Sequence, residues 1–248
     1  MNITPVVKQL LIINVIFFIG SQIVANGAVY DYLSLYFFEN PKFEFWQPLT
    51  HMFMHGGIMH IAFNMFALYS FGSNLEYIWG GKKFLFFYIS CGLGAAALHT
   101  LVNYYHYQDG YNLLFNNGFS AQEIRSLLNG GQVALDGRNA ISQDSLQSFY
   151  SAYNSQAVGA SGAIYGLLVA FAFMFPNAEL MMLFIPVPVK AKYFVPGILL
   201  FDLFSGVTGV SLFGGGNIAH FAHIGGAIVG FLMMWYWKKN QFNNNRWN

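Results

Sequence analysis

The chain has 248 residues and a formal net charge of +1; 56% of it is hydrophobic, 19% is aromatic and only 8% is charged. Soluble domains carry about 25% charged residues, so this composition excludes an ordinary soluble domain and predicts a membrane protein. The net charge by itself says nothing about nucleic acid, but the sequence has no basic run suited to binding it, so no nucleic-acid partner is expected. The single cysteine, Cys91, excludes an internal disulfide and is expected to be an inert core residue.

Six apolar segments are long enough to cross a bilayer, which takes about 20 mostly apolar residues. We interpret the first of them, which follows Lys8, as an uncleaved helix rather than a signal peptide. The predicted fold is an all-α polytopic membrane protein, a single domain over residues 1–248. Its six transmembrane helices have the approximate ranges 9–26, 52–72, 84–104, 157–175, 193–212 and 218–237.

The distribution of lysine and arginine predicts the orientation of the chain. With the N-terminus inside, eight of the eleven basic residues fall in inner segments, and Lys42, Arg125 and Arg138 fall in outer ones. By the positive-inside rule, both termini are then expected in the cytoplasm.

Two segments are expected outside the bilayer. The aromatic-rich stretch from Tyr30 to Trp46 has the composition of a membrane-interface segment. The stretch at 105–156 is too polar for the bilayer and too long for a plain connection, so we predict an external cap between helices three and four. Within it, Ser120 and Glu123 form a capping-box pattern for a short helix, and a second helix is expected around 142–153.

Polar residues in three of the predicted helices form the candidate site. Gly159-Ala160-Ser161-Gly162 opens the fourth span, His223 lies in the sixth, and His60 and Asn64 lie four residues apart on one face of the second. These three helices run from outside to inside. We expect His60, Ser161 and His223 about four or five residues, or roughly 6–8 Å, below the outer ends. Polar groups inside a membrane are costly and by default functional.

The chemistry of these residue types is nucleophilic catalysis. A serine hydroxyl attacks when an adjacent base takes its proton, which predicts a Ser161–His223 pair. Tyr165 is expected to stack on the His223 ring, while His60, Asn64 and the backbone N–H of Ser161 are candidate donors to an oxyanion. Small residues let the two helices approach closely, namely Gly162 and Gly166 on one and Gly226 and Gly230 on the other.

The remaining polar residues of the spans are expected to be structural. Asp202 lies deep in the predicted fifth helix, so we predict a Ser–His dyad without a carboxylate. His51, His55 and His220 are expected to have structural or interface roles.

These motifs resemble the rhomboid family of intramembrane serine proteases. The resemblance rests on residues 55–64, 159–162 and 222–230, which follow the family order. It implies that Ser161 is the nucleophile, His223 the general base, His60 and Asn64 the oxyanion side chains, and Tyr165 the ring that packs on His223. It also implies transmembrane protein substrates cut near their outer ends, a bacterial inner-membrane location, and no metal or other cofactor.

Two features depart from the family pattern. Trp46-Gln47 stands where the family often has Trp-Arg, which puts the ionic anchoring of the first outer loop in doubt. The insertion is also longer than in minimal bacterial members, and we expect it to influence substrate choice more than chemistry.

Two alternatives remain open at this stage. One is a histidine-based metal-handling membrane protein; the sequence places no acidic or thiol ligand at the depth of its histidines, which are His51, His55, His60, His220 and His223. The other is a catalytically inactive rhomboid-like protein that binds membrane clients, although such relatives characteristically lack the serine or the histidine. The natural substrate and the oligomeric state are not indicated.

Overall fold

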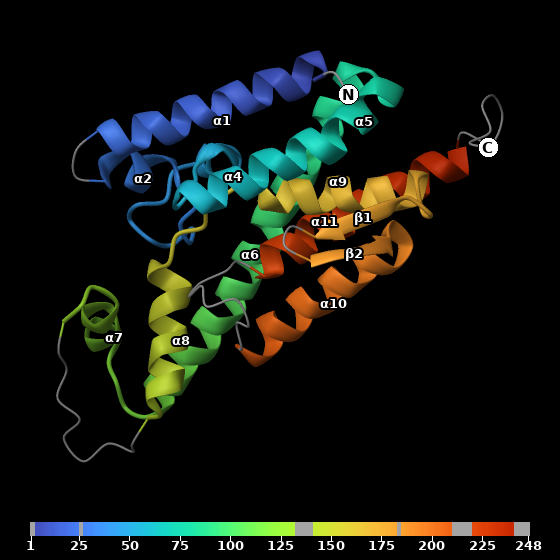
Figure 1. Ribbon diagram of the computed structural model, residues 1–248. Helices are drawn as coiled ribbons and strands as arrows, with labels where there is room; N and C mark the ends of the chain where they lie inside the picture. The colour runs from blue at the N-terminus through green and yellow to red at the C-terminus, as the bar shows by residue number, and fades with distance from the viewer. Residues whose placement is uncertain (1–2, 25–26, 132–140, 183–184, 210–219, 241–248) are drawn as a thin grey trace.

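The computed structural model describes residues 3–24, 27–131, 141–182, 185–209 and 220–240. The predicted helix ends at 210–212 and 218–219, and the middle of the predicted cap at 132–140, lie outside the described residues. The described part is helical apart from one two-stranded sheet, which confirms the all-α polytopic membrane fold (Figure 1). Within it, three helices are long and apolar enough to cross a membrane, namely α1 (Pro5–Ile23), α6 (Gly81–Asn116) and α10 (Ala191–Thr208).

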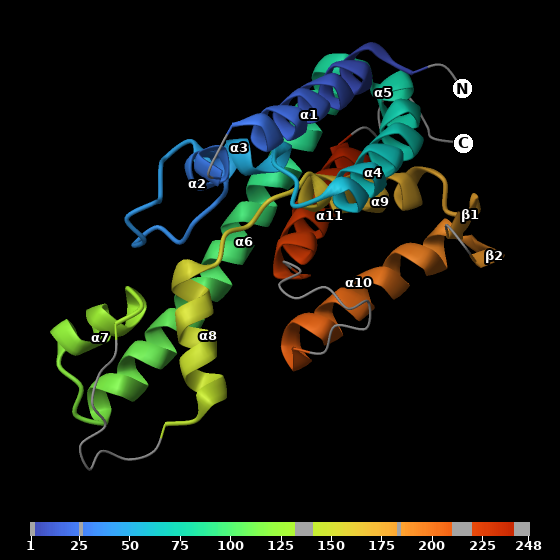
Figure 2. The same cartoon turned by 60° about the vertical axis from the view of Figure 1, so that its left-hand side comes forward.

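Each of the six predicted spans overlaps at least one helix of the described residues. The fourth is the shorter α9 (Ser161–Met174) and the sixth is α11 (His220–Asn240). The start of α1 and the end of α11 lie at one end of the molecule, and α7 and α8 lie at the other (Figures 1 and 2).

The second span differs from its predicted range of 52–72. The helix of this span, α4 (Ile58–Ala67), begins only after Gly56-Gly57. Before these glycines the chain forms three short elements, namely α2 (Ala28–Leu33), α3 (Gln47–Thr50) and the 3-10 turn η2 (His51–Phe53). Two consecutive glycines disfavour helix because of their backbone freedom, which explains the late start. The helix then continues through the π-helical turn η3 (Leu68–Gly72) into α5 (Ser73–Trp79).

The third helix is longer than predicted and forms part of the cap. α6 runs twelve residues beyond the predicted end at residue 104, because polar residues leave the bilayer without breaking a helix. On this extension lie α7 (Ala121–Leu128) and α8 (Gln143–Asn154), and α7 has both capping-box hydrogen bonds predicted for Ser120 and Glu123. A separate apolar cluster holds the cap together, consisting of Phe37, Tyr107, Leu114, Phe119, Ile124, Leu128, Phe149 and Ala152.

A short antiparallel hairpin joins α9 to α10, which the sequence did not predict. Strand β1 (Glu179–Met182) pairs with β2 (Ile185–Lys190), with Glu179 opposite Lys190 and Leu180 opposite Val189. The hairpin lies at the end of the bundle away from the cap (Figures 1 and 2).

Helices α6, α9 and α11 pack together at the centre, with α1 on one side of them and α10 on the other (Figures 1 and 2). Glycines allow this packing. A Cβ on Gly94 of α6 would stand 2.3 Å from a methyl group of Val229, and one on Gly225 of α11 would stand 2.6 Å from the carbonyl oxygen of Gly94. The surface of α6 around Gly94 is therefore the one that receives α11.

The carboxylate of Glu76 caps the first helix from a distance. Its oxygens accept hydrogen bonds from the Val6 and Val7 backbone N–H groups at 2.9 and 2.8 Å, and from the Thr4 hydroxyl. Thr4, the N-cap residue, makes no side-chain capping bond of its own to the helix. Since the first N–H groups of a helix lack internal acceptors and favour negative charge, Glu76 fixes the start of α1 against α5.

Glu76→Gln is expected to lower the stability of the protein by roughly 1–3 kcal/mol, because an amide cannot accept all three hydrogen bonds. Thermal unfolding in detergent measures this loss. Glu179→Gln is the control, since Glu179 is exposed at the start of β1 and should leave the midpoint unchanged. Equal midpoints for the two variants would contradict the capping role.

Candidate functional site

Ser161 is the first residue of α9, and the backbone before it is shaped for close approach. Gly159 has a φ of +125°, which L side chains rarely adopt. A Cβ on Gly159 would also stand 2.8 Å from Nε2 of His60 and 3.6 Å from Oγ of Ser161. Glycine at this position therefore lets His60 lie beside the serine. The N–H of Ser161 has no partner within the helix, as at any helix N-terminus.

Ser161 and His223 are in direct contact across two helices. The Ser161 Oγ lies 2.8 Å from Nε2 of His223. The ring of Tyr165, one turn along α9, stacks on the His223 imidazole with centroids 4.2 Å apart and planes 10° apart. The predicted contact and the predicted stacking are both present, and both side chains of the pair are half-buried.

His60 lies on the side of α4 that faces Gly159 and the serine, and Asn64 lies one turn further along the same helix. The backbone N–H of Gly56 donates to Nδ1 of His60 at 3.3 Å, so the ring proton resides on Nε2, the nitrogen that faces Gly159. Asn64 donates one amide N–H to the carbonyl oxygen of His60 at 3.0 Å. Its second N–H remains available to an oxyanion.

The polar groups lie nearer the helix ends than predicted. His60 is the third residue of α4, Ser161 the first of α9 and His223 the fourth of α11. The expectation of four or five residues was wrong because α4 and α9 begin later than their predicted spans. His60 and Ser161 thus lie in the first turns of α4 and α9.

The expectation that no carboxylate accompanies the pair was wrong. Oδ1 of Asp202 lies 3.2 Å from Nδ1 of His223 and 2.6 Å from Nδ1 of His220. Because the fifth helix was predicted to end at residue 212, Asp202 was expected ten residues from the outer end of that helix. The helix ends at Thr208, so Asp202 is six residues, or about 9 Å, from that end.

Backbone contacts between glycines set the distance between α9 and α11. A Cβ on Gly226 would stand 1.9 Å from the carbonyl oxygen of Gly162, and one on Gly230 would stand 2.8 Å from Cα of Gly166. All four glycines lie on the two small-residue faces that were predicted to approach each other; which glycine meets which comes from the structure. No larger residue fits at Gly226 without moving one helix away from the other.

The rhomboid domain model matches residues 42–122 and 138–240 of this chain. The chain belongs to the rhomboid family. Rhomboids are a family of intramembrane proteases that also includes inactive members. Every candidate site residue lies in the matched stretches.

The histidines of this rhomboid do not gather as the metal-handling alternative required. His51 pairs its Nδ1 with the carbonyl oxygen of Gln47 at 3.0 Å, and His55 packs edge-on against the ring of His60. Among the described residues, the side chains close enough to share a metal ion are instead Asp202, His220 and His223. An acidic residue therefore does stand at the depth of two histidines, contrary to the prediction.

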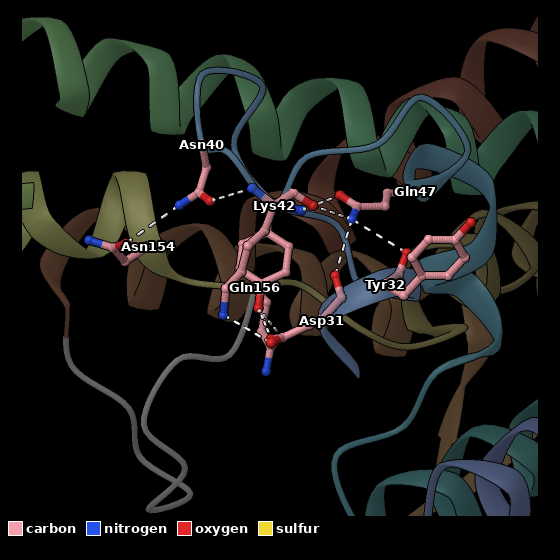
Figure 3. A network of polar contacts seen from close by, with 8 residues as sticks. Asp31, Tyr32, Asn40, Lys42, Gln47, Asn154 and Gln156 are labelled. Carbon is pink, nitrogen blue, oxygen red and sulfur yellow. Dashed lines mark hydrogen bonds and ion pairs between the residues drawn. The ribbon is translucent and has the colours of Figure 1, made fainter. Parts of the chain in front are cut away.

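A neutral network anchors the first outer loop of this rhomboid (Figure 3). Gln47 is fully buried; its Oε1 accepts from the Tyr36 N–H at 3.1 Å, and its Nε2 donates to the Lys42 carbonyl at 2.7 Å. The Asn40 amide donates to the Tyr153 carbonyl at 2.8 Å, which ties the loop to the cap. The loop is therefore held without the family arginine.

One ion pair lies at the edge of this network. Asp31 accepts from the Tyr36 hydroxyl at 2.7 Å and from the Lys42 ammonium at 3.0 Å. The Tyr36 hydrogen bond, followed by Lys42, holds the pKa of Asp31 below its ordinary value. Because the pKa is lowered on folding, the stabilisation is present at neutral pH and is lost as the pH falls through the native pKa. Both charged groups are half-exposed, so the contribution is small.

Gln47→Leu is expected to loosen the loop, because the Tyr36 N–H and the Lys42 carbonyl both lose their buried hydrogen-bond partner. Each unsatisfied group should lower the stability by about 1–3 kcal/mol. Gln47→Arg should also fail to restore the wild-type loop, since a guanidinium has no acceptor for the Tyr36 N–H. Hydrogen exchange at the Tyr36 amide measures the effect. Gln147→Leu, at an exposed position of α8, is the control. Unchanged protection in both Gln47 variants would contradict this anchoring.

Proposed function

We propose that this chain is an intramembrane serine endopeptidase that cleaves transmembrane helices of membrane proteins through Ser161 and His223. The observation that carries the proposal is the 2.8 Å contact between Ser161 Oγ and His223 Nε2 inside a rhomboid domain. This contact is the one that nucleophilic catalysis by a serine requires, since the imidazole must be within reach of the hydroxyl proton.

The proposed reaction is acyl transfer to serine followed by hydrolysis. Ser161 Oγ attacks the carbonyl carbon of the scissile peptide bond while its proton passes to Nε2 of His223. The resulting oxyanion accepts hydrogen bonds from the Ser161 N–H, His60 Nε2–H and the free N–H of Asn64. The helix N-terminus of α9 adds a favourable field for negative charge. His223 then protonates the departing amine, and water, activated by the same imidazole, hydrolyses the acyl-enzyme.

The protein is a multi-pass integral membrane protein, and its proposed location is the bacterial inner membrane with both termini cytoplasmic. In that orientation Ser161, at the start of α9, lies near the outer surface, where water is at hand for deacylation. The bilayer and the transmembrane helices of substrate proteins are its expected partners.

This orientation predicts opposite reactivities for two cysteine reporters in a Cys91→Ala background. Lys190→Cys, exposed in β2, should be shielded from a membrane-impermeant thiol reagent in intact cells, whereas Asn129→Cys, exposed after α7, should react. The physical reason is the excess of lysine and arginine on the side of Lys190. Labelling after lysis supplies the control for accessibility. The reverse pattern would place the serine at the inner surface.

Labelling with a fluorophosphonate distinguishes the proposal from its alternatives. Covalent labelling that disappears in Ser161→Ala, together with mass-spectrometric mapping of a cut in a reconstituted transmembrane substrate, supports the endopeptidase. Client binding without labelling or cleavage indicates an inactive relative. Loss of function on chelation alone indicates the metal-handling protein, for which Asp202, His220 and His223 supply the residue types.

A further inference from the structure

Asp202 is a buried carboxylate that joins the candidate site to a fourth helix. It lies on α10, is only 3% exposed, and reaches across to α11. Its Oδ1 faces two imidazoles at once, Nδ1 of His223 at 3.2 Å and Nδ1 of His220 at 2.6 Å. The two histidines are three residues apart and so lie on one face of α11.

This contact determines which nitrogen of His223 carries the proton. An ionised carboxylate oxygen only accepts hydrogen bonds, so the ring nitrogen that faces it is Nδ1–H. Nε2 of His223 then holds the lone pair, and Nε2 is the atom 2.8 Å from Ser161 Oγ. A neutral imidazole with the opposite tautomer would present an N–H to the serine and could not take its proton.

We propose that Asp202 is a positioning residue that acts through His223: it holds the imidazole in the Nδ1–H tautomer and stabilises the imidazolium formed when Ser161 is deprotonated. His220, bonded to the same oxygen, fixes the carboxylate against α11. The proposal rests on the proposed function and extends it from a dyad to an Asp–His–Ser chain built from α10, α11 and α9.

The packing between α10 and α11 is compatible with this role and also supplies a competing explanation. Gly206, one turn after Asp202, allows the approach, since a Cβ there would stand 3.1 Å from the Phe221 ring. Further along the two helices, an apolar cleft of about 580 Å³ opens among α9, α10 and α11, lined by Leu199, Leu203, Ile224 and Ile228 among others. Asp202 therefore also helps to dock α10, and the experiment must separate docking from positioning.

The kinetic test compares Asp202→Asn with His220→Ala in detergent-solubilised protein and one transmembrane substrate. Asp202→Asn is expected to lower kcat by roughly 10²–10⁴-fold with little change in KM, because the amide no longer enforces the Nδ1–H tautomer. Asp202→Glu keeps a carboxylate and should recover at least part of the lost kcat. His220→Ala breaks the shorter bond between α10 and α11 but keeps the carboxylate that faces Nδ1 of His223, and should cost less than tenfold.

The spectroscopic test does not depend on activity. With ¹⁵N-labelled histidine, NMR at a pH where the imidazoles are neutral reports which nitrogen of His223 is protonated, and a His223→Ala sample assigns its signals. Wild type and His220→Ala should both have Nδ1–H at His223, and Asp202→Asn should shift it toward Nε2–H. Asp202→Ser removes the carboxylate without adding an amide and replaces Asp202→Asn if that variant does not fold.

An unchanged His223 tautomer in Asp202→Asn or Asp202→Ser would overturn the positioning role. So would a His220→Ala variant that loses as much kcat as Asp202→Asn, because docking of α10 would then explain both losses. If wild-type protein neither labels nor cleaves, the proposed function fails, while the NMR comparison still decides whether Asp202 sets the state of His223.

Discussion

Ser161→Ala and His223→Ala are each expected to lower cleavage of a transmembrane substrate to background, because each removes one member of the nucleophile–base pair that the acyl step uses. The two side chains are 2.8 Å apart and act as a unit, so the double variant should be no worse than either single one. Cleavage rates on one detergent-solubilised substrate measure the losses, and thermal unfolding of each variant confirms that it is folded. Normal cleavage by a folded His223→Ala protein would remove the base from the mechanism.

The oxyanion donors should give graded losses, because three donors share the developing charge. His60→Ala is expected to lower kcat by roughly 10²–10³-fold, the usual cost of one such donor. Asn64→Ala should cost less, since Asn64 already spends one N–H on the His60 carbonyl. Asn74→Ala is the matched control: Asn74 donates to the Ser70 carbonyl four residues before it, as Asn64 does to His60, but from α5. A fully active His60→Ala, or an Asn64→Ala as inactive as Ser161→Ala, would contradict the assignment of donors.

The parts of the site that the sequence predicted are those that short-range geometry determines. Small residues spaced along two apolar helices favour close backbone approach in a membrane, so the contact between the glycine faces of α9 and α11 could be predicted, although not which glycine meets which. Tyr165 is one turn from Ser161 on the same helix, so its ring lies beside His223, the residue that contacts the serine. The capping box at Ser120 has a local hydrogen-bond pattern and was predicted for the same reason.

The contact of Asp202 with His223 could not be predicted because it depends on where a helix ends. A shift of four residues in the end of α10 moves a side chain by about 6 Å along the axis, which is enough to change Asp202 from a deep residue to a neighbour of the site. Hydropathy does not fix helix ends to that accuracy. One sequence signal was available: His220 and His223 share a face of one helix, and two imidazoles in an apolar setting require a polar partner.

The network around Gln47 was missed for a different reason. Its partners are mainly backbone groups of the first loop, such as the Tyr36 N–H and the Lys42 carbonyl, and side-chain identity says little about backbone positions. The family pattern suggested a charge at this position, and the structure has an amide that both donates and accepts. The anchoring function is kept with different chemistry.

Gly226→Ala is expected to lower both fluorophosphonate labelling and cleavage by at least about 10²-fold, a typical cost of misplacing a catalytic group by 1 Å. The added Cβ would stand 1.9 Å from the Gly162 carbonyl oxygen, and this oxygen is backbone, so it cannot rotate away. Gly226 lies three residues after His223, and Gly162 is next to Ser161. Separation of α9 from α11 at this level therefore lengthens the distance between Ser161 Oγ and His223 Nε2.

A series of glycine variants makes this prediction quantitative, because the contact that each added Cβ would meet is known. Gly230→Ala would place its Cβ 2.8 Å from Cα of Gly166, two turns from His223, and should cost less than Gly226→Ala. Gly197→Ala on α10 meets nothing within 4 Å and should be as active as wild type, with a small gain in helix stability. Labelling rates are compared only among variants whose thermal unfolding confirms a folded protein. A folded Gly226→Ala that labels at the wild-type rate would mean that the glycine contact between α9 and α11 does not set the distance between the serine and the histidine.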